Sequence, residues 1–198
     1  MPTFVFSFDI KPNKKVSGYS SVVRITDGKK DCCDVGNRVP NIKFYSNTFK
    51  MQIAFSLNGK GSVQFNTEPL KEGVYSTVVI KQTFTYGTSY RYSIAINGEE
   101  VYQAENKKAQ EFKNLKLYAG DEYTQQADVF IKNLKLNNIA GKWFIFLSVV
   151  FSLTSTQNLF HEHTIAYGVS RSLLNFLSSV FRNQRYQQPW RVVHARET

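Results

Sequence analysis

Three acidic residues in one stretch of eight are the first residues with the types and spacing for metal chemistry. Asp121, Glu122 and Asp128 fall within a segment rich in turn-forming residues. Calcium takes several oxygen ligands from carboxylates and carbonyls, so this loop is a candidate calcium site, although its spacing is not that of an EF-hand. The alternative is that the acids solvate a surface loop and hydrogen-bond its turns. Calcium is the one cofactor that these acids suggest.

Two adjacent thiols, Cys32 and Cys33, are the only cysteines of the chain. Asp31 and Asp34 flank them and Gly36 follows, which predicts a loop. Three states stay open: two free thiols, an intermolecular bridge, or a strained bridge between neighbours. Thiol catalysis usually needs a histidine, and residues 1–141 contain none. Zinc is equally poorly supported, because two cysteines fall short of four ligands.

Tyrosines beside turn residues are the third kind of candidate. A ring at such a position can stack on a sugar, although it can equally cover the edge of a sheet. Arg38 belongs to the loop that carries the cysteines, and loops on a rigid scaffold commonly carry function. The ligand-binding candidates are Tyr45, Tyr86, Tyr123 and Arg38.

The elements that must position these residues are strands. In residues 4–10, FVFSFDI, the apolar side chains alternate with small or polar ones, which predicts a strand with one buried face. Residues 51–57 and 63–65 form a predicted hairpin around the turn residues of 58–61, and Asn97-Gly98 predicts a second hairpin between 92–96 and a strand that begins at 101. Further predicted strands are 20–26, 42–45, 74–84, 112–118 and 128–136.

An all-β sandwich of about ten strands follows, because no segment before residue 140 has a sustained helical period. Its core is expected to hold the alternating aromatic and aliphatic residues. Those expected inside are Phe4, Phe6, Phe8, Phe55, Phe65, Ile94, Ile96 and Phe112.

Composition excludes several classes. The 198 residues are 42% hydrophobic and 20% charged, which argues against a disordered chain or a polytopic membrane protein. A net charge of +10 lets the chain meet phosphates, sulfates or anionic lipid. No recognition helix, zinc finger or RNP pattern accompanies that charge, so nucleic acid is not an expected partner.

Residues 141–198 differ from the rest, because arginine replaces lysine as the main base and aspartate disappears. We therefore expect a domain over 1–140 and a tail over 141–198 that is poorly ordered or partly helical. Its apolar run 143–153 is too short for a bilayer span and predicts a packed helix, with membrane contact through 143–160 as the lesser alternative. Residues 169–181 predict an amphipathic helix. A further hypothesis is that the tail is translated intron.

The segment YSIAINGEEVYQAENKKAQEFKNLKLYAGDEYTQQADVFIKNLKL resembles the C-terminal half of a concanavalin A-like lectin/glucanase domain, close to laminin G-like modules. The matching motifs are I-A-I-N-G at 94–98, Y-A-G-D at 118–121 and I-K-N-L at 131–134, and residues 6–12 resemble the first strand of the family. The resemblance covers residues 3–137 and implies a jelly-roll sandwich.

The resemblance implies a noncatalytic module that recognises carbohydrate or an extracellular protein, sometimes through calcium. Two alternatives stay open: a glycan-cleaving enzyme of the glucanase branch, and a purely structural or adhesive module with a protein partner. The enzymes of that branch carry an E-x-D-x-E or E-x-D-x-x-E run, and this sequence has none, so catalysis is not expected. The family implies an extracellular location, whereas a chain that starts at Met1 without a signal peptide would stay in the cytoplasm.

Overall fold

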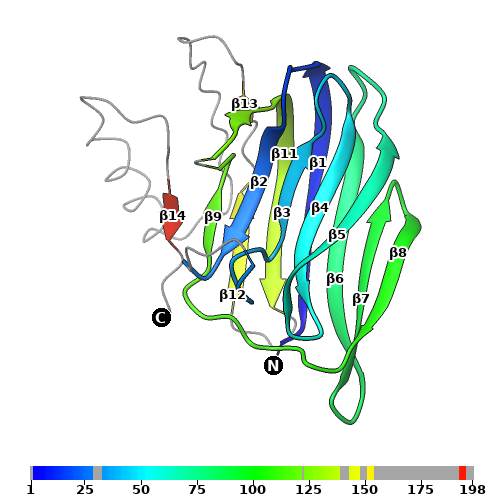
Figure 1. Ribbon diagram of the computed structural model, residues 1–198, viewed down its shortest axis with the longest axis vertical. Helices are drawn as coiled ribbons and strands as arrows, with labels where there is room; N and C mark the ends of the chain where they lie inside the picture. The colour runs from blue at the N-terminus through cyan, green and yellow to red at the C-terminus, as the bar shows by residue number, and fades with distance from the viewer. Residues whose placement is uncertain are drawn as a thin grey trace.

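The protein is a sandwich of two antiparallel β-sheets in a computed structural model that describes residues 2–28, 33–121, 123–138, 143–147, 151–153 and 192–194, the last three segments by their backbone alone. None of these residues is helical. Figure 1 shows the two sheets as stacked layers with strands running along the long axis of the molecule. The prediction of an all-β sandwich is confirmed.

The described residues form fourteen strands, which build the two layers. Their bounds are β1 (Phe4–Lys14), β2 (Ser20–Thr26), β3 (Asn41–Phe44), β4 (Lys50–Leu57), β5 (Lys60–Pro69), β6 (Ser76–Tyr86), β7 (Ser89–Ile96), β8 (Glu99–Asn106), β9 (Lys116–Tyr118), β10 (Gln125–Gln126), β11 (Asp128–Asn138), β12 (Trp143–Leu147), β13 (Phe151–Leu153) and β14 (Val192–His194).

The first sheet has the order β12-β11-β1-β6-β7-β8, with β13 also paired to β11. The second sheet has the order β14-β9-β2-β3-β4-β5, with the short β10 parallel to β2. The first strand of the chain is therefore central in its sheet, where it pairs with β11 on one side and β6 on the other. The pairing begins with Phe4 opposite Asn138 and ends with Lys14 opposite Asp128.

Two tight turns set the register of the hairpins. Asn97 and Gly98 have φ of 53° and 86°, and Ile96 pairs with Glu99, so these two residues alone form the loop between β7 and β8. Asn58 and Gly59 have φ of 52° and 77° and connect β4 to β5 in the same way. Positive φ at both central residues matches the right-handed twist of the paired strands. The predicted Asn-Gly hairpin is confirmed.

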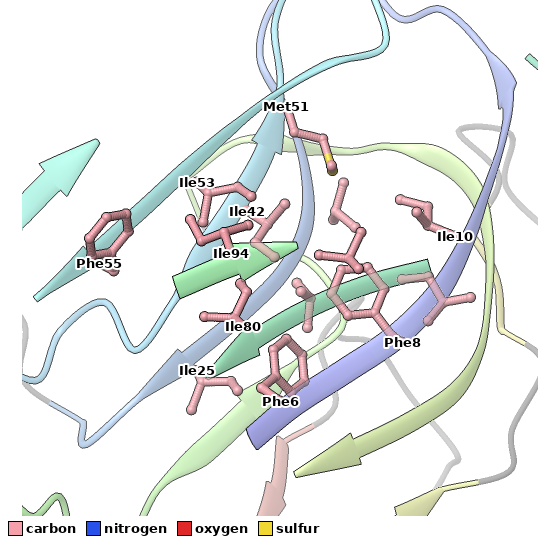
Figure 2. Close-up of a cluster of buried hydrophobic side chains, with 14 of the residues drawn as sticks. Phe6, Phe8, Ile10, Ile25, Ile42, Met51, Ile53, Phe55, Ile80 and Ile94 are labelled. Carbon is pink, nitrogen blue, oxygen red and sulfur yellow. The ribbon is translucent and has the colours of Figure 1, made fainter. Parts of the chain in front are cut away.

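The core lies between the sheets and is built by alternation along each strand. Figure 2 shows side chains of both sheets pointing toward one another, among them Phe6 and Phe8 of β1, Ile80 of β6, and Ile42 and Ile53 of the second sheet. Burial of each such side chain contributes roughly 1.5–3 kcal/mol. Of the residues expected in the core, four are fully buried, and four are partly buried against it, namely Phe4, Phe65, Ile96 and Phe112.

The structure of the tail differs from the helix predicted for residues 143–153. The apolar run expected to be helical over 143–153 instead contains β12 and β13, which pair with β11 at residues 134–138 and 129–131. The physical reason is that β11 would otherwise end the sheet with its backbone groups unpaired, and an aromatic, β-branched segment suits such an edge. Strand β14 likewise pairs with β9. The predicted amphipathic helix at 169–181 lies outside the described residues.

The hypothesis of membrane contact through residues 143–160 bears on the helices of the structure. Among the residues that the structure describes, none forms a helix long and apolar enough to cross a bilayer. The described parts of the run 143–160 are the two short strands on β11.

Candidate functional site

The outer face of the second sheet carries rows of polar side chains across neighbouring strands. Alternation places Met51, Ile53 and Phe55 of β4 in the core, so Gln52 and Ala54 face outward. Cross-strand pairing then defines two rows. The first joins Tyr118, Arg24, Asn41, Ala54 and Gln64, and the second joins Ser21, Lys43, Gln52 and Asn66.

The part of these rows open to a ligand is on β4 and β5, where Gln52, Gln64 and Asn66 reach solvent. The rest of both rows on β2, β3 and β4 includes buried residues, namely Ser21, Arg24, Asn41 and Ala54. Directly opposed residues of antiparallel strands have Cβ atoms about 5 Å apart, so each side chain contacts the next in its row. Five strands at about 4.8 Å spacing make the first row about 19 Å long. We name the exposed part the amide face, defined by Gln52, Gln64 and Asn66.

Tyrosine and amide side chains are linked at one border of the amide face. The Tyr45 hydroxyl donates to Asn66 Oδ1 at 2.8 Å and accepts from Gln52 Nε2 at 3.1 Å. Gln52 Nε2 also donates to Gln64 Oε1 at 3.2 Å. Asn66 and Gln64 therefore accept through their amide oxygens, which leaves their NH₂ groups to donate to a ligand.

The Tyr45 ring does not stand alone. Its centroid lies 5.1 Å from that of Tyr19, whose side chain is 44% exposed. Desolvation and then the neighbouring Tyr45 hydroxyl raise the pKa of Tyr19, so the Tyr19 phenol stays neutral and able to donate a hydrogen bond. The pair offers a polar-edged aromatic surface beside the amide side chains.

At the β2 border, Tyr123 covers a buried arginine. The Arg24 guanidinium carbon lies 5.4 Å from the centroid of the Tyr123 ring, which is 62% exposed. Next to Arg24 in the row, Asn41 is only 6% exposed, and its Oδ1 has no hydrogen-bond partner among the described residues. Buried polar atoms are normally satisfied, so this buried acceptor is a place where an ordered water can donate.

Asp121 holds the adjacent loop in place. Its side chain is fully buried, and Lys43 Nζ lies 2.7 Å from Oδ2. Oδ1 accepts from the backbone N–H groups of Tyr123 and Thr124 and from the Thr124 hydroxyl, at 2.8–3.0 Å. Burial acts to raise the pKa of Asp121, but the Lys43 ammonium and these hydrogen bonds outweigh it, so the pKa is lowered. The carboxylate thereby fixes the loop that presents Tyr123.

The loop before β3 lies over the other end of the same face. The Ser56 backbone N–H donates to the Arg38 carbonyl at 3.1 Å, and the Arg38 guanidinium donates to the Ser62 hydroxyl. A Cβ atom on Gly61 would overlap the Cys33 carbonyl, so only glycine allows this approach. Arg38 is thereby positioned at the border of the amide face.

Four of the sequence-predicted site residues therefore belong to one region: Tyr45, Arg38, Asp121 and Tyr123. Tyr86 does not, because it lies in the first sheet at the end of β6, is 70% exposed and donates to Glu105 at 3.4 Å. Asp128 also lies in the first sheet, at the start of β11, where it accepts from Asn13 at 3.2 Å. Cys33 is exposed, and its neighbour Cys32 lies outside the described residues.

The calcium hypothesis requires a cluster of oxygen ligands around the loop that follows β9. The described side chains include no group of three or more His, Cys, Asp and Glu residues that could hold a metal ion. Both Asp121 oxygens already have protein partners, and Asp128 accepts from a different element. Glu122 lies outside the described residues, so calcium binding stays a prediction.

The amide side chains were missed from the sequence. Gln52, Gln64 and Asn66 each stand at a polar position of an alternating strand, where the pattern predicts only exposure to solvent. What makes them a site is the register of β3, β4 and β5, which places them side by side. The signal available in the sequence was the kind of polar residue: positions 52, 64 and 66 hold uncharged amides, where lysine or glutamate is commoner on an exposed sheet.

The chain matches no protein-family model, no curated protein and no solved structure.

Proposed function

We propose that this chain is a noncatalytic recognition module that binds carbohydrate through the amide face. The proposal includes the finer fold assignment, a concanavalin A-like jelly roll of the laminin G-like type, which rests on the motifs at 94–98, 118–121 and 131–134. Recognition of extracellular ligands, as the resemblance implies, belongs to the same proposal.

One observation carries it: Gln52, Gln64 and Asn66 lie side by side in a hydrogen-bonded group with Tyr45. Sugars present hydroxyl groups that both donate and accept, and they present apolar ring faces. Amide side chains supply both donors and acceptors, and a tyrosine ring supplies a surface for stacking.

The positions of the Asp and Glu residues favour a binding module over a glycan-cleaving enzyme. Glycoside hydrolysis needs two carboxyl groups about 5–10 Å apart, one of them free to act as a proton donor. Strands β2, β3, β4 and β9 contain no Asp or Glu, and β5 contains only Glu68 near its end. Asp121 is ion-paired with Lys43, and its lowered pKa makes it a poor general acid.

The test is a glycan array probed with the full chain, followed by calorimetric titration of the best oligosaccharide. We expect Gln52→Ala, Asn66→Ala and Tyr45→Phe each to weaken binding about tenfold, because each removes a hydrogen bond at the ligand. Matched variants on the first sheet, Gln103→Ala and Tyr86→Phe, should bind like the wild type. The bound oligosaccharide should stay uncleaved over the titration.

Two outcomes would contradict the proposal. Absence of binding to any glycan would leave the rival module with a protein partner. Equal weakening by the variants of both sheets would show that the ligand site is elsewhere. Repeating the titration with a chelator tests the calcium hypothesis separately, since a calcium-dependent site loses its affinity there.

A further inference from the structure

The two sheets end on one side of the sandwich with edge strands of opposite character. Strand β8 ends the first sheet and carries Glu99, Glu100 and Glu105, so charge blocks its pairing with another strand. Strand β5 ends the second sheet, and its only sheet partner among the described strands is β4. From residue 61 to residue 67 its sequence is GSVQFNT, which contains neither charge nor proline.

An uncharged edge of this length is a template for strand addition. Its apolar residues are also incompletely covered: Val63 and Phe65 face the core but are only partly buried, and Phe65 reaches the Tyr102 ring at 5.2 Å. A strand placed beside β5 would cover this open margin of the core.

We propose that the occupant of this edge is a second copy of the chain, with two β5 strands paired antiparallel about a twofold axis at Gln64. In that register residue i of one copy faces residue 128 − i of the other, so Val63 faces Phe65 and Ser62 faces Asn66. The charges at the two ends of the strand are complementary, because the same register places Lys60 of each copy beside Glu68 of the other.

The regular part of β5 is short, as expected for a strand that pairs with its own copy over a few residues. The pairing of β5 with β4 is regular from Val63 to Asn66, and irregularities interrupt it on either side. Bulges twist an edge away from a straight partner, so the inferred backbone pairing centres on residues 62–66. Lys60 and Glu68 lie just beyond it and meet through their long side chains. A closed twofold pair of this kind ends the sheet and stops further growth.

The consequence is a joint ligand surface. Gln64 and Asn66 of β5 belong to the amide face, so pairing at β5 brings the amide faces of two copies into one sheet. This part of the inference rests on the proposed function, whereas the dimer itself does not. A glycan with repeated units would then bind with an effective-concentration advantage at the second site.

The experiment measures the mass of the full chain by light scattering and sedimentation, in about 0.15 M salt, where distant charges are screened. We expect a dimer. Lys60→Glu and Glu68→Lys should each raise the dimer Kd by about tenfold or more, because each places two like-charged pairs at the twofold interface. The double variant Lys60→Glu/Glu68→Lys should restore the wild-type Kd, since it rebuilds both pairs in reverse.

Matched controls carry the same charge changes away from β5: Glu99→Lys on β8, and Lys113→Glu, which is exposed in the segment before β9. Both should dimerise like the wild type. A monomeric wild type, a dimer unaffected by the single variants, or a double variant without rescue would overturn the inference. None of these variants removes a residue of the amide face, so failure of the dimer leaves the glycan titration interpretable.

Discussion

At the scale of single residues, the Lys43–Asp121 pair shows how charge fixes a surface loop. Lys43 comes from β3 and is 17% exposed at its side chain, while Asp121 lies in the loop after β9 and is fully buried there. Removing one partner of such a pair leaves the other charge desolvated and unpaired. The pair is therefore a stability determinant as well as the support of Tyr123.

We predict that Asp121→Asn lowers the free energy of unfolding by about 2–3 kcal/mol at neutral pH. A lowered pKa means that the folded carboxyl binds protons less readily than the unfolded one. Its stabilising contribution is thus present above the ordinary value of 3.8 and is lost as the pH falls through the lower folded pKa. Urea unfolding at pH 7 and near pH 3 should show the difference between variant and wild type shrink in acid. Asp128→Asn is the control, and an equal difference at both pH values would contradict the ion-pair explanation.

Tyr92 is the opposite case, a polar group whose burial is not compensated. It is 2% exposed, stacks on Phe55 with ring centroids 4.4 Å apart, and has a hydroxyl without a hydrogen-bond partner among the described residues. Burial, and then the charge of Tyr102, raise its pKa well above 10.0. The folded state therefore disfavours ionisation of this phenol.

We expect Tyr92→Phe to be neutral or to stabilise the domain by up to about 1 kcal/mol, because it removes an unsatisfied buried group and keeps the ring. The raised pKa adds a second expectation. Stability linked to the neutral phenol is present below pH 10 and is lost as the pH rises through the folded pKa, so the variant should resist alkaline unfolding better. Tyr102→Phe serves as the partly exposed comparison. Clear destabilisation of Tyr92→Phe would mean that the hydroxyl has a partner.

At the scale of elements, the β7–β8 turn gives the sharpest prediction. Gly98 has φ of 86°, and a Cβ built there would meet no atom within 4 Å, so only backbone conformation opposes a side chain. Gly98→Val should lower the free energy of unfolding by about 1 kcal/mol or more. Asn97→Asp keeps a residue that tolerates positive φ and keeps the oxygen that accepts from the Thr77 backbone N–H at 2.9 Å, so it should change stability much less. An unchanged denaturant midpoint for Gly98→Val would contradict the assigned turn.

Most strands could be predicted because alternation is a local property. Residues 20–26 were expected as a strand and form β2 with the same bounds, and 128–136 closely match β11. The segment 112–118 was overestimated, since only Lys116–Tyr118 pair with a neighbour. The residues of the candidate site were harder to predict from the sequence. Tyr45 and Arg38 stand out beside turn residues, whereas Gln52 and Asn66 acquire a role only through their pairing across two strands.

At the scale of the whole molecule, the two sides of the sandwich differ. On one side, β12 and β13 add to β11, and β14 adds to β9, so segments from residues 143–194 supply the outermost described strands there. On the other side, β5 and β8 end their sheets (Figure 1). The inferred pairing of two copies uses the β5 edge on this second side.

We predict that residues 1–140 fold without the tail, because the buried core described here ends at Leu134. Circular dichroism should show a cooperative β-type melt for the truncated chain. Amide hydrogen exchange in β11 should become faster, since β12 and β13 no longer pair with it. Retained protection in β11 would argue against the tail pairing, and loss of the cooperative melt would show that the tail is required for folding.

The register of β1 on β11 also determines how the domain responds to mechanical force. Phe4 pairs with Asn138, so a tension applied between these two residues pulls on one end of the strand pair and breaks its hydrogen bonds one after another. Tension between Lys14 and Asn138 acts along the strands instead and strains all the bonds of the pair together. Optical-tweezers handles at the two pairs of positions should therefore give a low rupture force in the first geometry and a distinctly higher one in the second.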